Sequence, residues 1–295
     1  MKPWDNLTAG NILLPALIAF LLLLPSHSLG ETASSFSISL GFEFASGDYG
    51  TTQTSDSYSI PLTIGYYPGE RFDFTLEIPY LYQSDSSTVS LGNNRVPTQT
   101  SSSPTGGQGM GGPGGGINAV PAAVTGEATT VTSSSQSGLG DISLTAGFLL
   151  ITESTSVPMI RPLAYIKIPT ADKEKGLGTG AFDFGGGLSV AKNFGNLATY
   201  VEALYNYPGT TSTYGPDNYL TYQGSLRYQL TQNLNLGGAV SGGTPAFAEA
   251  SDYLEIQVTS SYRVSQRGSL GVYLGKGLTD SSPDYTTGFY GAISF

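Results

Sequence analysis

The chain has 295 residues, enough for one large domain or two small ones, and only 12% of them are charged, against about a quarter in ordinary soluble proteins. Its net charge of −10 argues against a nucleic-acid partner, because such a partner requires a basic face. The absence of cysteine excludes a disulfide framework and thiolate chemistry, while 40 glycines and 19 tyrosines favour an all-β protein with many short strands.

An apolar run at residues 12–25 is followed by the small residues Ser28 and Gly30. This pattern predicts a signal peptide, residues 1–30, that is cleaved after Gly30. The alternative is a transmembrane anchor, but the run is shorter than the roughly twenty residues that a spanning helix needs. Cleavage would leave a chain without histidine, because the single His27 lies inside the signal.

From residue 36 onward, apolar residues alternate with small or polar ones in a series of short segments. In the first segment, one face carries the residues Phe36, Ile38, Leu40, Phe42 and Phe44. A period of two with one apolar face predicts strands that have a lipid-facing and a lumen-facing side. Pro61 and Pro79 are expected at bulges or local gaps near the rim, because proline cannot donate to a ladder. The expected strands are 36–44, 58–66, 72–82, 141–151, 160–168, 182–190, 201–207, 220–230, 234–242, 254–264, 269–276 and 284–295.

The connections after odd-numbered strands are long or polar, and those after even-numbered strands are tight. In transmembrane barrels the extracellular loops are long and the periplasmic turns are short. The stretch 83–139 has no alternation, is rich in Gly and Ser, and is expected to be a long extracellular loop. Residues 31–295 are therefore predicted to form an all-β, transmembrane antiparallel β-barrel of about 12 strands, surrounded by the lipid of the bacterial outer membrane.

The last strand carries apolar residues at every second position and stops on an aromatic residue. It resembles the C-terminal signal of outer-membrane β-barrels, with Phe289, Ile293 and Phe295 as its apolar positions. This resemblance implies that the outer-membrane barrel assembly machinery is a partner. The strand must also pair with the first one, because an exposed edge is not tolerated in lipid. The alternative is an amphipathic strand of a soluble sandwich.

Charged residues at lumen-facing positions divide into two groups when they are placed by height along the alternating strands. A basic inner half is expected to contain Arg161, Arg227 and Arg263, with Asp73 as its only acid. The other group predicts an acidic outer half that contains Glu43, Glu77, Asp141, Asp183, Glu202 and Glu255, with only Lys167 among them. If the lumen is open, these pore-lining groups should favour cations and neutral solutes over anions. The alternative is that the charges pair with one another and plug the barrel.

No catalytic, metal-binding or cofactor-binding constellation is present in the sequence. Without His27 and without cysteine, the chain lacks the commonest general base and the commonest metal ligands. Acid pairs such as Asp73 with Glu77 could in principle transfer protons, but lumen-facing carboxylates are usually solvated. We therefore expect no enzymatic activity, no cofactor and no metal.

Three stretches together resemble one known family. They read SGLGDI at 137–142, KIPTADKEKGLGTGAFDF at 167–184 and GKGLTDSSPDYTTGFYGAISF at 275–295. The chain is similar there to outer-membrane transporters named for the meta-pathway of phenol degradation. The resemblance implies a barrel that takes up small organic solutes by passive diffusion, with aromatic or hydrophobic compounds among the candidates, and it supplies no functional residues. The alternative function is a structural or adhesive outer-membrane barrel with no open pore.

Overall fold

The computed structural model describes residues 36–49, 54–84, 88–91, 94–97, 135–211, 215–246 and 251–295. The predicted signal peptide, residues 1–30, lies outside the described residues, as does most of the stretch 83–139. No helix in the described ranges is long and apolar enough to cross a membrane.

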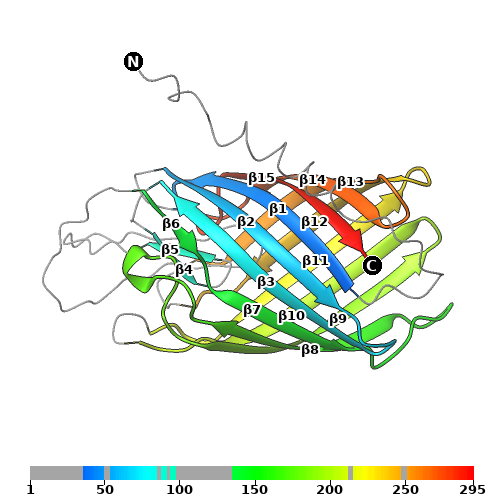
Figure 1. Ribbon diagram of the computed structural model, residues 1–295, viewed down its shortest axis with the longest axis horizontal. Coiled ribbons are helices and arrows are strands. Elements are labelled where there is room, and N and C mark those ends of the chain that lie inside the picture. The colour runs from blue at the N-terminus through cyan, green and yellow to red at the C-terminus, as the bar shows by residue number, and fades with distance from the viewer. Residues whose placement is uncertain are drawn as a thin grey trace, which may run out of the picture.

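The strands form one antiparallel sheet that closes on itself as a tilted barrel (Figure 1). Thirteen strands belong to the sheet, but β6 and β7 both pair with β3 and share one place, so the wall has twelve strand positions. The barrel predicted from the alternation is thereby confirmed. The strands are β1 (Phe36–Gly47), β2 (Ser55–Tyr66), β3 (Phe72–Gln83), β6 (Gln136–Leu139), β7 (Ile142–Phe148), β8 (Met159–Ile168), β9 (Asp183–Phe194), β10 (Leu197–Tyr207), β11 (Tyr219–Gln229), β12 (Leu234–Gly243), β13 (Tyr253–Arg263), β14 (Gly268–Gly277) and β15 (Tyr285–Ser294).

The barrel closes between the first and last strands. Strand β1 pairs with β2 on one side and with β15 on the other, from Ser37 opposite Ser294 to Ser46 opposite Tyr285. Beyond the last ladder pair, the Phe295 N–H donates to the Phe36 carbonyl at 2.8 Å. No edge of the main sheet is left open along this seam, which is the condition for a sheet to lie in lipid.

A bulge separates β6 from β7. Glu77 lies opposite Ser143, whereas Tyr80 lies opposite Leu139, so the register on β3 changes by one residue. The extra residue faces Pro79, whose carbonyl accepts the Gly140 N–H at 2.8 Å. The bulge expected at Pro79 is therefore present, next to Asp141, and the β1–β2 ladder has a gap at Pro61, between the pairs Leu40–Leu62 and Glu43–Ser59. The wall here also begins earlier than expected, at Gln136, inside the stretch that was predicted to be loop.

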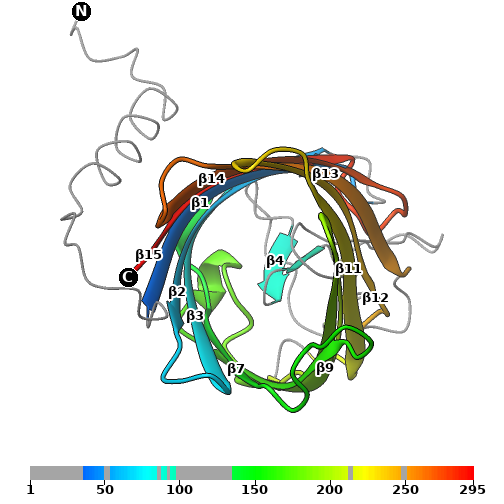
Figure 2. The ribbon, with the colours of Figure 1, turned by 90° about the vertical axis from the view of Figure 1, so that its right-hand side faces the viewer.

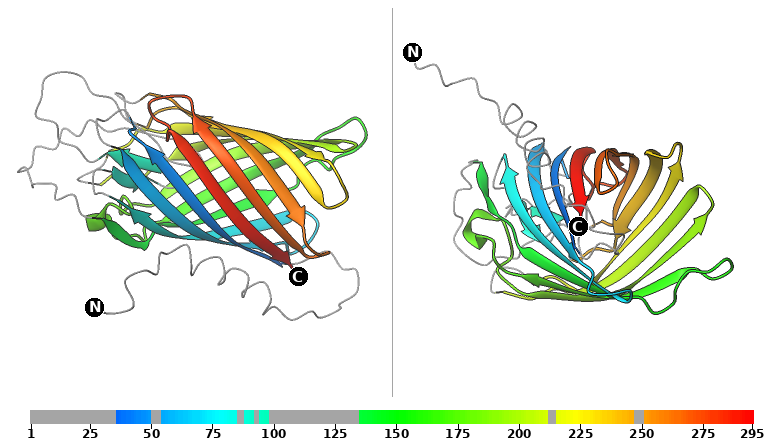
Figure 3. Two further views of the ribbon diagram at one scale, coloured as in Figure 1. Left: turned by 90° about the horizontal axis from the view of Figure 1, so that it is seen from above. Right: turned by 45° about the vertical axis from the view of Figure 1, so that its right-hand side comes forward.

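The two ends of the barrel differ in their connections. We call one the turn end, because four of its connections are the short segments 67–71, 195–196, 230–233 and 264–267. The fifth, 149–158, is longer, but Ile151 continues the ladder by pairing with Ile160. The other end, here the long-loop end, carries the connections after β1, β3, β8, β10, β12 and β14. The last strand finishes at the turn end (Figure 3).

Exposed aromatic residues form a belt at each end of the outer surface. At the turn end, the Phe36 and Tyr66 rings stack with centroids 4.7 Å apart. At the long-loop end, the Tyr58 ring lies 5.0 Å from Phe44. Between the belts the outer surface is aliphatic, and Val258 is 70% exposed. An apolar band between two aromatic belts matches a bilayer with its two interfaces.

A short hairpin interrupts the long connection after β3. It consists of β4 (Thr88–Leu91) paired antiparallel with β5 (Asn94–Pro97). Views across and along the barrel place this hairpin within the outline of the wall, toward the long-loop end (Figures 1 and 2). The other element there is the single-turn helix η1 (Lys173–Lys175), in the connection between β8 and β9.

The seam between β1 and β15 predicts a role for Phe295. Deleting Phe295 removes its hydrogen bond to Phe36 and an apolar side chain at the membrane interface, so assembly of the barrel should fall. Deleting residues 98–134, which lie outside the described wall strands, should lower assembly less. The measurement is the fraction of heat-modifiable, folded protein in isolated outer membranes. Equal assembly of the wild type and the Phe295 deletion would show that the end of β15 is dispensable.

Candidate functional site: the barrel lumen

Strand alternation places small and polar side chains on the inner wall. Two tyrosines on the last two strands show how large side chains fit on the inner wall without filling the lumen. Tyr273 lies opposite Gly288, and Tyr290 lies opposite Gly271, in a reciprocal cross-strand pair. A Cβ at Gly271 would sit 2.2 Å from the Tyr290 ring, and one at Gly288 would sit 2.4 Å from the Tyr273 ring. Each ring therefore lies flat against the wall over a glycine, and only glycine leaves room for it there.

Three of the predicted charges form a buried cluster at the long-loop end. The Lys167 ammonium lies 3.1 Å from an Asp141 carboxylate oxygen and 2.8 Å from an Asp183 oxygen. It also donates to the Thr179 hydroxyl at 3.0 Å. All three charged side chains are at most 3% exposed. The cluster gives its charges partners within the wall, so they do not act as separate charges in the lumen.

The same cluster fastens two loops to the barrel. The second oxygen of Asp141 accepts the Ala171 N–H at 3.0 Å, and that of Asp183 accepts the Gly209 N–H at 3.0 Å. These contacts tie the connections after β8 and β10 to the rim. The KIPTADKEKGLGTGAFDF block therefore includes Lys167 and Asp183 as the anchor of its own loop.

Glu255 is held by neutral donors on the inner wall. Its carboxylate accepts hydrogen bonds from the Tyr253 hydroxyl at 2.5 Å, the Thr286 hydroxyl at 2.5 Å and the Gln257 amide at 2.9 Å. Glu255 is fully buried. The three donors come from β13 and β15, so Glu255 links two strands that do not pair directly.

The other acids of the predicted outer half face the lumen with fewer partners. Glu202 accepts hydrogen bonds from the Tyr200 hydroxyl and, at 3.1 Å, from the Gln223 amide. Glu43 and Glu77 are half-buried, and neither belongs to an ion pair among the described residues. Within the described residues, these three carboxyl groups lack the cationic partner that Asp141 and Asp183 share.

The predicted basic group divides in two. Arg161 forms an ion pair with Asp73, across from β8 to β3. Arg227 and Arg263, near the turn end of β11 and β13, are exposed and have no ion-pair partner in the described part of the chain. Positive charge therefore collects at the turn end, on the side of the barrel formed by β11 to β13.

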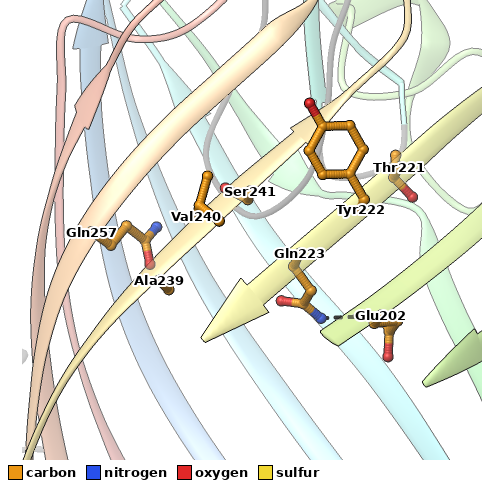
Figure 4. Close-up of a pocket in the computed structure, with 8 residues that line it drawn as sticks. All are labelled: Glu202, Thr221, Tyr222, Gln223, Ala239, Val240, Ser241 and Gln257. Carbon is orange, nitrogen blue, oxygen red and sulfur yellow. Dashed lines mark hydrogen bonds between the residues drawn. The ribbon is translucent and has the colours of Figure 1, made fainter. Parts of the chain in front are cut away.

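Three cavities lie along the β9–β15 side of the wall. A cavity of about 120 Å³ is bordered by Glu202, Gln223, Ser241 and Gln257 (Figure 4). The largest, about 540 Å³, extends from β9 to β15 and is lined by polar residues and by the rings of Tyr200, Tyr273 and Tyr290. A third, about 160 Å³, surrounds Arg227 and Arg263 at the turn end. The lumen is thus incompletely filled by the described side chains.

The lumen residues were predicted from the charged positions of the sequence alone, so the prediction did not include the neutral residues that line these cavities. Tyr200, Tyr273 and Tyr290 occupy lumen-facing positions of the same alternation that placed the charges. Their position could have been predicted from that pattern alone. No cluster of three or more His, Asp or Glu side chains that could hold a metal ion occurs among the described residues.

A closed antiparallel barrel with an aliphatic band, two aromatic belts and a polar lumen is the architecture of outer-membrane β-barrels. The protein is of this class. The family model described as "Putative MetA-pathway of phenol degradation" matches residues 96–295, and the chain belongs to that family. The resemblance noted in its sequence is confirmed. No curated protein sequence matches the chain.

Solved structures are similar to the chain at low sequence identity. An outer membrane channel from Pseudomonas putida F1 has a TM-score of 0.60 and 13% identity, and the match covers 92% of this chain and 100% of that one. The translocator domain of the autotransporter NalP from Neisseria meningitidis has a TM-score of 0.48 and 9% identity, with coverages of 97% and 96%. The CymD monoaromatic hydrocarbon channel has a TM-score of 0.44 and 10% identity, with coverages of 90% and 90%. The similarity to the Pseudomonas putida F1 channel supports the barrel fold.

The buried cluster around Lys167 predicts a large effect on stability. Lys167→Met would leave Asp141 and Asp183 buried without their counter-ion and should lower the free energy of unfolding by about 3–5 kcal/mol. Lys276→Met is the matched control at the same end, because Lys276 is 61% exposed and lies 3.7 Å from Asp284. Its effect should stay below about 1 kcal/mol. Urea unfolding of the barrel in lipid vesicles measures both, and equal effects would contradict the assignment.

Proposed function

We propose that the protein is a channel of the bacterial outer membrane that lets small organic solutes diffuse through its lumen. It is exported by the signal peptide, residues 1–30, and inserted by the outer-membrane barrel assembly machinery. Its long-loop end faces the cell exterior, and its turn end faces the periplasm, in agreement with the usual asymmetry of such barrels. The family and the barrel fold support this proposal.

The observation that carries the proposal is the unfilled lumen. Barrels of eight strands are just filled by side chains, whereas those of sixteen leave an aqueous channel. With twelve positions, this wall keeps a cavity of about 540 Å³ lined by tyrosines and polar groups. The glycines beneath Tyr273 and Tyr290 hold those rings against the wall and away from the axis. A small organic molecule finds both apolar ring faces and hydrogen-bonding groups along this path.

Blocking the lumen tests the path directly. Thr259 faces the cavity, whereas its neighbour Val258 faces outward and is 70% exposed. Thr259→Trp should lower the single-channel conductance in planar bilayers, because the indole occupies the lumen. Val258→Trp adds the same side chain to the lipid side and should leave conductance unchanged. Absence of conductance in every variant, the wild type included, would support the alternative of a structural or adhesive barrel.

The lumen acids Glu43 and Glu77 predict the ion preference of the channel. The double variant Glu43→Gln/Glu77→Gln removes two lumen carboxyl groups that form no ion pair among the described residues, and it should lower the preference for cations in reversal-potential measurements. Salt should weaken the wild-type preference, because it screens these charges. Asp284→Asn is the control, since Asp284 lies at the long-loop end and pairs with the outward-facing Lys276. An unchanged reversal potential in the double variant would exclude these acids as the determinants of selectivity.

A further inference from the structure

The turn end of the lumen contains a pocket that is rich in hydrogen-bond donors. Arg227 and Arg263 line it, one from β11 and the other from β13. Asn235, on the strand between them, and Gln229 add two side-chain amides. The pocket has a volume of about 160 Å³, enough for an oxyanion and a few water molecules. Two guanidinium groups and neutral amides converge here without a bound anion from the described chain.

No carboxylate of the described residues forms an ion pair with Arg227 or Arg263, and two of the carboxylates near this end are held by other groups. Asp73 is paired with Arg161. Glu153 lies 3.1 Å from the Lys192 ammonium and accepts the Asn193 backbone N–H at 2.8 Å. The hydrogen bonds from Asn193 and the contact with Lys192 hold the pKa of Glu153 below its usual value, so it stays an anion bound to these partners. Neither carboxylate forms an ion pair with Arg227 or Arg263.

The arginine pocket adjoins the tyrosine-lined cavity. Arg227 and Asn193 line both, so the guanidinium stands at the boundary between a polar pocket and a space of about 540 Å³. On the other side of this boundary, the rings of Tyr273 and Tyr290 rest on glycines with one face against the wall. Tyr200 lines the same cavity from β10. The two adjoining spaces together are amphipathic: the arginine pocket supplies cationic hydrogen-bond donors, and the larger cavity supplies aromatic ring faces.

We propose that these two adjoining spaces form a binding site for a small organic acid with an aromatic body. The carboxylate is held by Arg227 and Arg263, whose planar guanidinium groups match the geometry of a carboxylate. The ring lies against Tyr273 and Tyr290, where stacked or edge-to-face contacts with an aromatic ligand are favourable. This inference rests on the proposed function, because it names a ligand class for the channel. Binding at the site does not itself require the lumen to conduct.

Binding can be measured on the purified barrel without any conductance. The probe is 4-fluorobenzoate, followed by fluorine NMR line broadening in zwitterionic detergent at neutral pH. Arg227→Gln/Arg263→Gln should weaken binding at least about tenfold, since each lost charge-assisted hydrogen bond contributes more than a neutral one. The neutral analogue 4-fluorobenzamide should bind the wild type at least about tenfold more weakly than the acid, for the same reason.

Matched variants separate the site from general electrostatics. Arg267→Gln removes an equal charge from the β13–β14 turn, outside the pocket, and should keep at least half of the wild-type affinity. Tyr290→Ala should weaken 4-fluorobenzoate but leave acetate, which has no ring, unaffected. Each variant is first shown to be folded by its heat-modifiable mobility. Equal binding of 4-fluorobenzoate by the wild type and the double arginine variant overturns the proposal, as does an equal loss in Arg267→Gln.

A planar bilayer distinguishes failure of the site from failure of the channel. In a conducting barrel, 4-fluorobenzoate added on the turn-end side should reduce the current at lower concentration than when added on the long-loop side, because acids line the longer approach. The double arginine variant should abolish this sidedness. Binding without conductance would overturn the channel and keep the site, and conductance with symmetric block would overturn the site and keep the channel.

Discussion

Hydrogen bonding of the backbone in lipid is the constraint on which this structure depends. The hydrocarbon core offers no water to an unpaired N–H or carbonyl, so a sheet can cross it only if its two edges meet. Here they meet between β1 and β15, where ten residue pairs run from Ser37 opposite Ser294 to Ser46 opposite Tyr285. Once this seam is formed, the outer face of every strand is committed to lipid and the inner face to the lumen. The alternation of apolar with small or polar residues along the wall strands follows from that commitment.

Charges inside the wall are arranged by height. Near the long-loop rim, Lys167 is enclosed by Asp141 and Asp183, and the cluster tethers two loops to the wall. Also toward this rim, Glu255 is held by tyrosine, threonine and glutamine side chains, and at mid-strand Glu202 accepts hydrogen bonds from Tyr200 and Gln223. At the turn end, Arg227 and Arg263 are exposed to the lumen. In the proposed channel, a solute that enters at the long-loop end would therefore meet acidic groups before the two arginines.

Most of the fold was predictable because membrane strands carry a strong periodic signal. The closed antiparallel barrel with its twelve wall positions follows from a period of two. The ion pairs could not be predicted in the same way. Which charged residues meet depends on the cross-strand register, and alternation alone does not determine that register. Lys167 meets Asp183 because these two residues lie directly opposite in the β8–β9 ladder. Strand β6 was missed for a different reason: its residues QSGL lack a lipid-facing alternation. The tyrosine-lined cavity was missed because neutral residues were not followed by height.

Tyr273 pairs with Gly288, and Tyr290 pairs with Gly271. The width of the lumen therefore depends on the absence of a Cβ atom at these two glycines. A single base change in a glycine codon can introduce alanine, and the new methyl would displace a tyrosine ring from the wall toward the axis. Width and chemistry of the lumen are thus adjustable at these positions without touching the strand count, the seam or the lipid-facing surface. In evolutionary terms, the diameter of such a pore can change by point mutation while the assembled barrel remains the same.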